Sequence, residues 1–107
     1  MERTIKFIAN AVRWFDKVNG NTYHSVRVTR CADGQTIAVP FQYGYGDSYR
    51  HSALSAMAGA GWLGEKYQGE HANGSSRCWS FDTENGYPIQ WEVRDGKKRE
   101  CVANGER

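Results

Sequence analysis

This 107-residue sequence has few of the residues that build metal centres. Its three cysteines, Cys31, Cys78 and Cys101, are far apart and form no CxxC pair. None of the three histidines stands at a zinc-type spacing from a cysteine, so we expect no metal site. We expect one or two of the cysteines to be small buried apolar residues and the others to be surface thiols.

The sequence also lacks a long apolar run and a strong charge of either sign. No stretch approaches the ~18 apolar residues of a membrane span. The N-terminus carries Glu2 and has no unbroken apolar core, which excludes a secretion signal. We therefore expect a cytoplasmic protein without membrane contact. Fourteen Lys and Arg against twelve Asp and Glu leave a net charge of +2, which does not indicate nucleic acid as the main partner.

Catalytic and nucleotide-binding motifs are missing as well. The segment FQYGYGDSYRHS has glycines before an expected helix, but it matches neither GxxxxGK[ST] nor GxGxxG. Ser25 follows His24 directly, and neighbouring residues on a strand point to opposite faces, so these two cannot form a dyad. Asp16 could approach His24 across a hairpin, but such a polar pair is an ordinary sheet contact. We expect no enzymatic activity and no cofactor.

Turn dipeptides and β-branched or aromatic runs are abundant instead. Asn-Gly at 19–20 and Asp-Gly at 33–34 and 95–96 suit the type I′ turns of hairpins. The runs between them predict a meander of three strands over residues 4–15, 22–30 and 36–41. Further strands are expected at residues 77–81 and 88–94, with a short edge strand at 97–102.

One segment has helical periodicity. Asp47 or Ser48 can cap a helix that ends near Ala60, with an apolar stripe at Tyr49, Ala53, Ala56, Met57 and Ala60. The expected order is therefore three strands, one helix, then two or three strands. We predict a single α+β domain over residues 1–107, with a five- or six-stranded antiparallel sheet and one helix packed on one face.

The candidate contact residues combine tyrosines with basic side chains. Tyr43, Tyr45 and Tyr49 stand beside Arg50, a composition typical of binding hot spots and of stacking on unpaired bases. Alternatively, one or two of these tyrosines cover the sheet edge. Arg13, Lys17 and Arg27 could form a cationic patch across the first hairpin, or could be surface charges that only aid solubility.

The first half of the chain resembles a family of small proteins from bacteriophages and prophages. The string RWFDKVNGNTYHSVRV, the segment PFQYGYG and the alanine-rich stretch after it carry the resemblance, over about residues 4–63. The family brings no function with it. Phage proteins of this size without enzymatic motifs are often accessory factors, and some inhibit bacterial immune systems, as anti-CRISPR proteins do.

By analogy with such phage proteins, we expect a non-enzymatic accessory protein that blocks or modulates a host protein or nucleoprotein complex. The expected mechanism is steric, with Arg13, Lys17, Arg27, Tyr43, Tyr45, Tyr49 and Arg50 in the contact. The alternative is a nucleic-acid-binding accessory protein of phage recombination or replication, whose affinity would fall steeply with salt.

Overall fold

Three consecutive strands form an antiparallel meander, as the turn dipeptides predict. The computed structural model describes residues 4–44, 46–69 and 77–106. Strand β1 (Phe7–Asp16) pairs with β2 (Asn21–Arg30), and β2 pairs with β3 (Thr36–Tyr43). A bulge shifts the register of β3 between the partners of His24 and Val26. The meander is confirmed.

The fourth strand runs parallel to the first. Strand β4 (Ile89–Asp95) pairs with β1 from Phe7↔Ile89 to Arg13↔Asp95, so the order in the sheet is β3-β2-β1-β4. The expected five- or six-stranded antiparallel sheet is therefore wrong, since the described residues form one mixed sheet of four strands. Helix α1 (Ser48–Gly59) and the short helices after it carry the chain to the far edge of the sheet, as a parallel connection requires.

The segment predicted as a strand at residues 77–81 is helical. A 3₁₀ turn (Arg77–Ser80) leads directly into the short helix α2 (Phe81–Glu84). Cys78 and Phe81 are both buried and stand three residues apart, which is a helical spacing. Trp79, expected to share a strand face with Phe81, is 51% exposed. Another 3₁₀ turn, Glu65–Tyr67, lies between α1 and this region.

The predicted edge strand at residues 97–102 is also a helix, α3 (Lys98–Asn104). The Lys97 N–H donates to the Glu100 carboxylate at 2.9 Å, so the Lys-Lys-Arg-Glu sequence starts a helix. Cys101 is fully buried one turn later. The described chain thus has an α+β fold with three α-helices rather than one.

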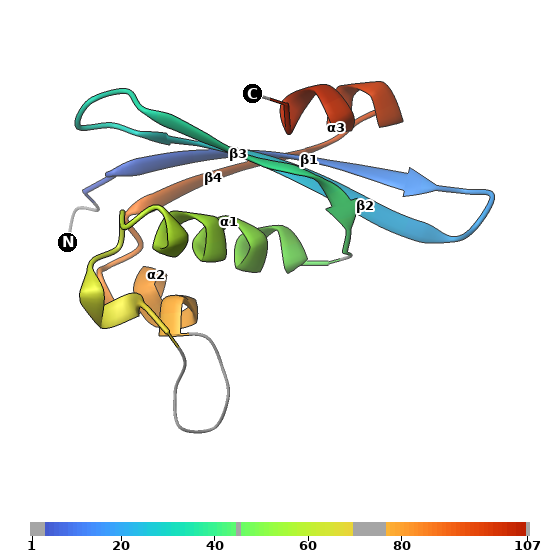
Figure 1. Cartoon of the computed structure of the whole chain (residues 1–107). Coiled ribbons are helices and arrows are strands. Elements are labelled where there is room, and N and C mark those ends of the chain that lie inside the picture. The colour runs from blue at the N-terminus through green and yellow to red at the C-terminus, as the bar shows by residue number, and fades with distance from the viewer. Residues whose placement is uncertain (1–3, 45, 70–76, 107) are drawn as a thin grey trace.

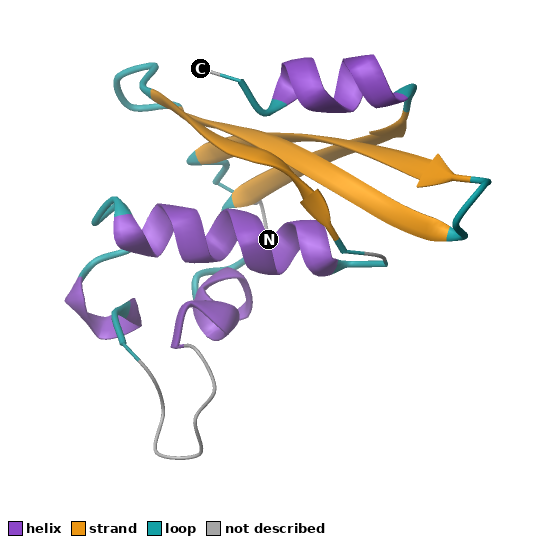
Figure 2. Ribbon diagram, turned by 45° about the vertical axis from the view of Figure 1, so that its right-hand side comes forward, coloured by secondary structure: helices purple, strands orange, loops and turns teal. Residues whose placement is uncertain are grey.

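The helices cover both faces of the sheet. Figure 2 shows α1 along one face and α3 across the other. On the α1 side, Tyr49, Ala53 and Met57 of the predicted stripe are buried. They pack against a core that includes Phe7, Ala9, Ala11, Val26, Val28, Val39 and Ile89.

Polar contacts hold α3 to the opposite face. The Ser25 hydroxyl donates to the Cys101 carbonyl, and Asn104 Nδ2 donates to the Asn10 carbonyl at 3.0 Å. Ser25 therefore points to α3, whereas His24 contacts Ser52 of α1. The prediction that Ser25 and His24 point apart is confirmed.

The cysteines divide between core and surface. Cys78 and Cys101 are buried and Cys31 is exposed, as predicted. All three are free thiols. In the part of the chain that the structure describes, no helix has the length and apolar character needed to cross a membrane.

Candidate binding surface at the projecting hairpin

The β1–β2 hairpin reaches beyond both neighbouring strands. Pairing with β4 ends at Arg13↔Asp95, and pairing with β3 ends at Tyr23↔Tyr43. We call residues 14–22 the hairpin arm. Figure 1 shows its turn projecting past the ends of α1 and α3. The arm is therefore open to a partner on several sides.

The turn of the arm is organised by Asp16. Its carboxylate accepts hydrogen bonds from the Val18 N–H at 3.0 Å and from Asn19 Nδ2 at 2.8 Å. The side-chain hydrogen bond from Asn19 is the main cause that lowers the pKa of Asp16. Gly20 adopts φ +72° and donates to the Asp16 carbonyl at 2.7 Å. The turn spans residues 17–20, longer than a two-residue type I′ turn. This network fixes the end of the arm.

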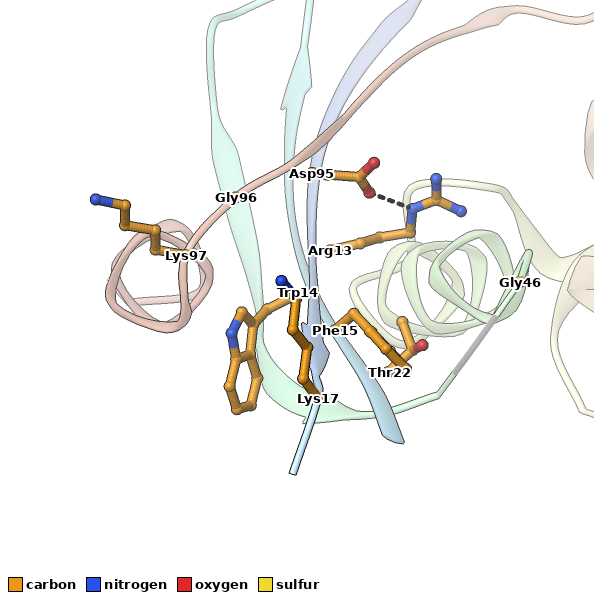
Figure 3. A pocket seen from close by; sticks show the side chains of 9 residues that line it. All are labelled: Arg13, Trp14, Phe15, Lys17, Thr22, Gly46, Asp95, Gly96 and Lys97. Atoms are coloured by element: carbon orange, nitrogen blue, oxygen red, sulfur yellow. Dashed lines mark ion pairs between the residues drawn. The ribbon is translucent and has the colours of Figure 1, made fainter. Parts of the chain in front are cut away.

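Apolar side chains of the arm face solvent. Phe15 is 54% exposed and Val18 at the tip is 91% exposed. Figure 3 shows Phe15 and Arg13 on one side of β1 and Trp14 on the other, as strand alternation requires. Exposed apolar groups that gather on one projection mark an interaction surface more often than scattered ones do.

An aromatic cluster borders the arm on the α3 side. The Tyr23 ring lies 5.5 Å from Trp14, 5.0 Å from Phe41 and 5.8 Å from Tyr43, measured between ring centroids. Trp14 and Phe41 are 6.2 Å apart. Lys98 Nζ lies 5.6 Å from the Trp14 ring centroid. Because the rings contact one another, the cluster makes a firm base for the arm.

A hollow opens where β4 ends beside β1. It has a volume of about 560 Å³, and we call it the edge hollow (Figure 3). Arg13 Nε lies 3.4 Å from Asp95 Oδ1, and the Gly96 N–H makes a final backbone bond to the Arg13 carbonyl at 2.8 Å. Beyond Arg13, none of the described strands pairs with β1 on this side. The residues that line the edge hollow are Arg13, Trp14, Phe15, Lys17, Thr22, Gly46, Asp95, Gly96 and Lys97.

Charge around the edge hollow is unbalanced. The Arg13 guanidinium faces the Asp95 carboxylate, so these two charges offset each other. Lys17 and Lys97 also line the hollow, and Asp95 is the one acidic residue among its described lining residues. The surface is therefore apolar with a basic border.

The structure separates the residues predicted as one contact site. Arg13 and Lys17 line the edge hollow, and Tyr43 is 59% exposed beside the arm. Tyr49 is only 5% exposed and packs against Trp91, while Arg50 covers both of these rings. Tyr45 lies outside the described residues.

Arg27 does not join Arg13. The register pairs Asn10 with Arg27 and Arg13 with His24, so the two arginines lie on opposite faces of the sheet. Arg27 donates to the Glu106 carbonyl after α3. The proposed cationic patch across the hairpin is therefore wrong.

Sequence reasoning missed Phe15, Val18 and Lys98. Phe15 follows Trp14, so strand alternation alone could have shown that one of the two rings faces away from the other. Nothing in the sequence indicates that Lys98 lies over Trp14, because residues 97–102 read as a strand. Whether Phe15, Val18 and Lys98 lie at the arm and its cluster depends on tertiary packing.

His24 links β2 to the segment between β3 and α1 and to α1 itself. It is 1% exposed, with Nε2 at 2.9 Å from Ser52 Oγ and Nδ1 at 3.3 Å from the Gly44 carbonyl. A Cβ on Gly44 would lie 2.7 Å from His24 Cε1, so a side chain there would collide with the imidazole. Asp16, the partner considered from the sequence, instead binds its own turn. His24 is a satisfied core histidine.

Burial of His24 predicts acid sensitivity. Burial lowers the pKa of His24 from 6.5, although the hydrogen bond to Gly44 opposes that shift. Below about pH 6.5 the unfolded chain then binds a proton that the folded chain does not, so stability falls as the pH falls. We expect the free energy of unfolding to drop as the pH falls below about 6.5, by up to about 1.4 kcal/mol per pH unit. Urea unfolding at several pH values measures this slope.

Two variants test whether His24 causes this dependence of stability on pH. His24→Gln removes the titrating group, and we expect a flat profile in the same window. His51→Asn changes an exposed histidine and should keep the slope. Asp16, Asp33 and Glu100 have lowered pKa values, and their contributions are lost only below their ordinary values of 3.8 to 4.5. An unchanged slope in His24→Gln would show that another group is responsible.

Metal ligation does not define a site in the described residues. In residues 4–44, 46–69 and 77–106, no three His, Cys, Asp or Glu side chains come close enough together to hold a metal ion. A scan against models of protein families, and searches of curated proteins and of solved structures, give no match to this chain.

Proposed function

We propose that this chain is a non-enzymatic binding protein that acts by covering a surface of a partner macromolecule. The hairpin arm is the contact. The observation that carries the proposal is the exposure of Phe15 (54%) and Val18 (91%) on a projection whose base is fixed by packed rings. A rigid apolar projection inserts into a partner with little loss of conformational entropy.

The surroundings of the arm favour a partner protein that has an apolar recess with an acidic border. Lys17 and Lys97 flank the edge hollow, and Lys98 lies over Trp14. Such charges steer encounter with an acidic partner, while the apolar core of a contact supplies affinity.

The resemblance to small phage and prophage proteins supports a partner in the bacterial host. Steric occupation needs no cofactor or nucleophile, and it is how inhibitors of bacterial immune systems work in the anti-CRISPR manner. We place this action in the cytoplasm of the host cell. This step rests on the resemblance, not on the geometry of the arm.

A comparative capture experiment tests the proposal. The intact chain, the double variant Phe15→Ser/Val18→Ser and the control Tyr87→Ser are each immobilised and exposed to lysate of the bacterial host. Tyr87 is 52% exposed, a fraction similar to that of Phe15, and it does not line the edge hollow. We expect one host complex to be retained by the intact chain and the control and lost from the double variant. Equal retention by all three would refute the role of the arm.

Nucleic-acid binding is the second candidate, favoured by Lys98 over a half-buried aromatic cluster of which Tyr43 is exposed. The cluster could offer ring edges to unpaired bases, although its rings already contact one another. Titration with single-stranded DNA at 50 and 200 mM salt decides. Affinity that falls steeply between these concentrations supports this candidate, and no binding at low salt removes it.

A further inference from the structure

A second hollow lies on the α1 side of the sheet, away from the apolar tip of the arm. It has a volume of about 650 Å³. We call it the ring-walled hollow. Strand β3, the start of α1 and the 3₁₀ turn Arg77–Ser80 contribute its walls. The residues that line it are His24, Gln42, Tyr43, Gly46, Asp47, Ser48, His51, Ser52 and Trp79.

An exposed ring forms one wall of this hollow. Trp79 is 51% exposed. His51 meets Trp79 edge to face, with ring centroids 5.0 Å apart and an interplanar angle of 88°. The contact with His51 holds the indole in place, so Trp79 offers a fixed apolar surface to a ligand.

The inner part of the hollow is polar and ordered. Ser52 Oγ lies 2.9 Å from His24 Nε2 and 3.4 Å from Gln42 Oε1. The buried His24 ring is fixed in turn by the Gly44 carbonyl. A ligand therefore meets hydroxyl and amide groups that are already oriented.

Asp47 adds a carboxylate at the mouth. It occupies the N-cap position of α1, is exposed and makes no side-chain capping hydrogen bond. The nearby Arg50 is attracted to it, but the guanidinium lies over the rings of Tyr49 and Trp91. The Asp47 oxygens are thus placed to accept hydrogen bonds from ligand hydroxyls.

The charge of the lining excludes anionic ligands. No Lys or Arg is among the described residues that line this hollow, and its carboxylate would repel a phosphate. Apolar rings beside hydroxyl, amide and carboxylate groups match a ligand with apolar C–H faces and many hydroxyls. Sugars have both features.

We propose that the ring-walled hollow binds an uncharged carbohydrate. A sugar face stacks on Trp79, and its hydroxyls reach Asp47, Ser48 and Gln42. This function is separate from partner binding by the hairpin arm. A nucleoside is the competing neutral ligand, and it is an outcome of the test.

The test is an NMR titration that follows the indole N–H of Trp79. The probes are maltotriose, cellotriose and tri-N-acetylchitotriose, with adenosine and uridine as competing ligands. Trp79→Phe assigns the signal by removing it. We expect at least one trisaccharide to shift this signal saturably, with a dissociation constant on the order of 1 mM. No shift with any trisaccharide, or a shift with a nucleoside alone, would overturn the proposal.

Two acidic variants locate the binding. Asp47→Ala removes the carboxylate and should weaken the sugar about ten-fold, whereas Glu92→Ala removes an exposed carboxylate of β4 and should bind as the intact chain does. Equal weakening in both would refute the site. Phe15→Ser/Val18→Ser should keep full sugar binding, so failure of the arm proposal and failure of this one are distinguishable.

Discussion

Gly105→Ala is expected to lower the free energy of unfolding by about 3 kcal/mol. A Cβ at this position would lie 2.8 Å from the Val39 carbonyl oxygen, 2.9 Å from the Phe41 nitrogen and 2.9 Å from Pro40 Cα. These are backbone atoms of β3, which cannot rotate away as a flexible side chain can. The end of α3 must therefore lift from the sheet. The hydrogen bonds that join α3 to the sheet, from Ser25 to the Cys101 carbonyl and from Asn104 to the Asn10 carbonyl, are then weakened.

Gly59→Ala is the matched control. It lies at the end of α1, and a Cβ there would meet no atom within 4 Å. Removing a glycine from a helix should stabilise the chain by about 0.5–1 kcal/mol. Urea denaturation of both variants gives the comparison. If Gly105→Ala is as stable as Gly59→Ala, the end of α3 does not pack closely against the backbone of β3.

Phe15→Ala is expected to weaken binding of the proposed host partner at least about 30-fold, which corresponds to about 2 kcal/mol. The ring borders the edge hollow and is more than half exposed in the free chain, so its removal leaves the core intact. Stability should change by no more than about 0.5 kcal/mol. Calorimetric titration of the purified partner measures the affinity.

Tyr87→Ala serves as the control for Phe15→Ala, because it removes an aromatic ring of similar exposure outside the edge hollow. Its affinity should equal that of the intact chain. A loss of affinity common to both variants would point to a general effect of surface apolar area. If Phe15→Ala binds the partner with the affinity of the intact chain, the arm is not part of the contact.

Local chemistry explains why the meander could be predicted. The Asn19-Gly20 and Asp33-Gly34 turns fix where the strands reverse, and Gly20 and Gly34 both adopt positive φ. Alternation of apolar residues then sets which face each side chain occupies. Burial of Tyr49, Ala53 and Met57 follows in the same way from the periodicity of α1, whereas Ala60 of the predicted stripe lies past the end of the helix and is exposed.

The direction of β4 could not be predicted, because a strand sequence does not specify its neighbour. Ile89 and Trp91 alternate with the polar residues Gln90 and Glu92, and an edge strand has this pattern whether its neighbour runs antiparallel or parallel. The crossover by α1 decides the outcome, since it delivers β4 next to β1 instead of β3. For a similar reason, residues 97–102 suited either an exposed edge strand or a short helix.

Which of the candidate contact residues reach solvent was harder to predict than the strands. Tyr49 lies in a tyrosine-rich segment, yet it faces the core because it begins the buried stripe of α1. Exposure of Phe15 depends on β4 stopping at Asp95, which is a tertiary feature. Composition indicated aromatic and basic contacts, but only the sheet geometry indicates which ones face solvent.

Site-specific photo-crosslinking in the host cell tests the central role of the hairpin arm most directly. A photoreactive phenylalanine analogue replaces Phe15 in one chain and Tyr87 in another. We expect a discrete adduct with one host complex from position 15 and none from position 87. Adducts of equal yield from both positions, or an adduct from position 87 alone, would contradict it.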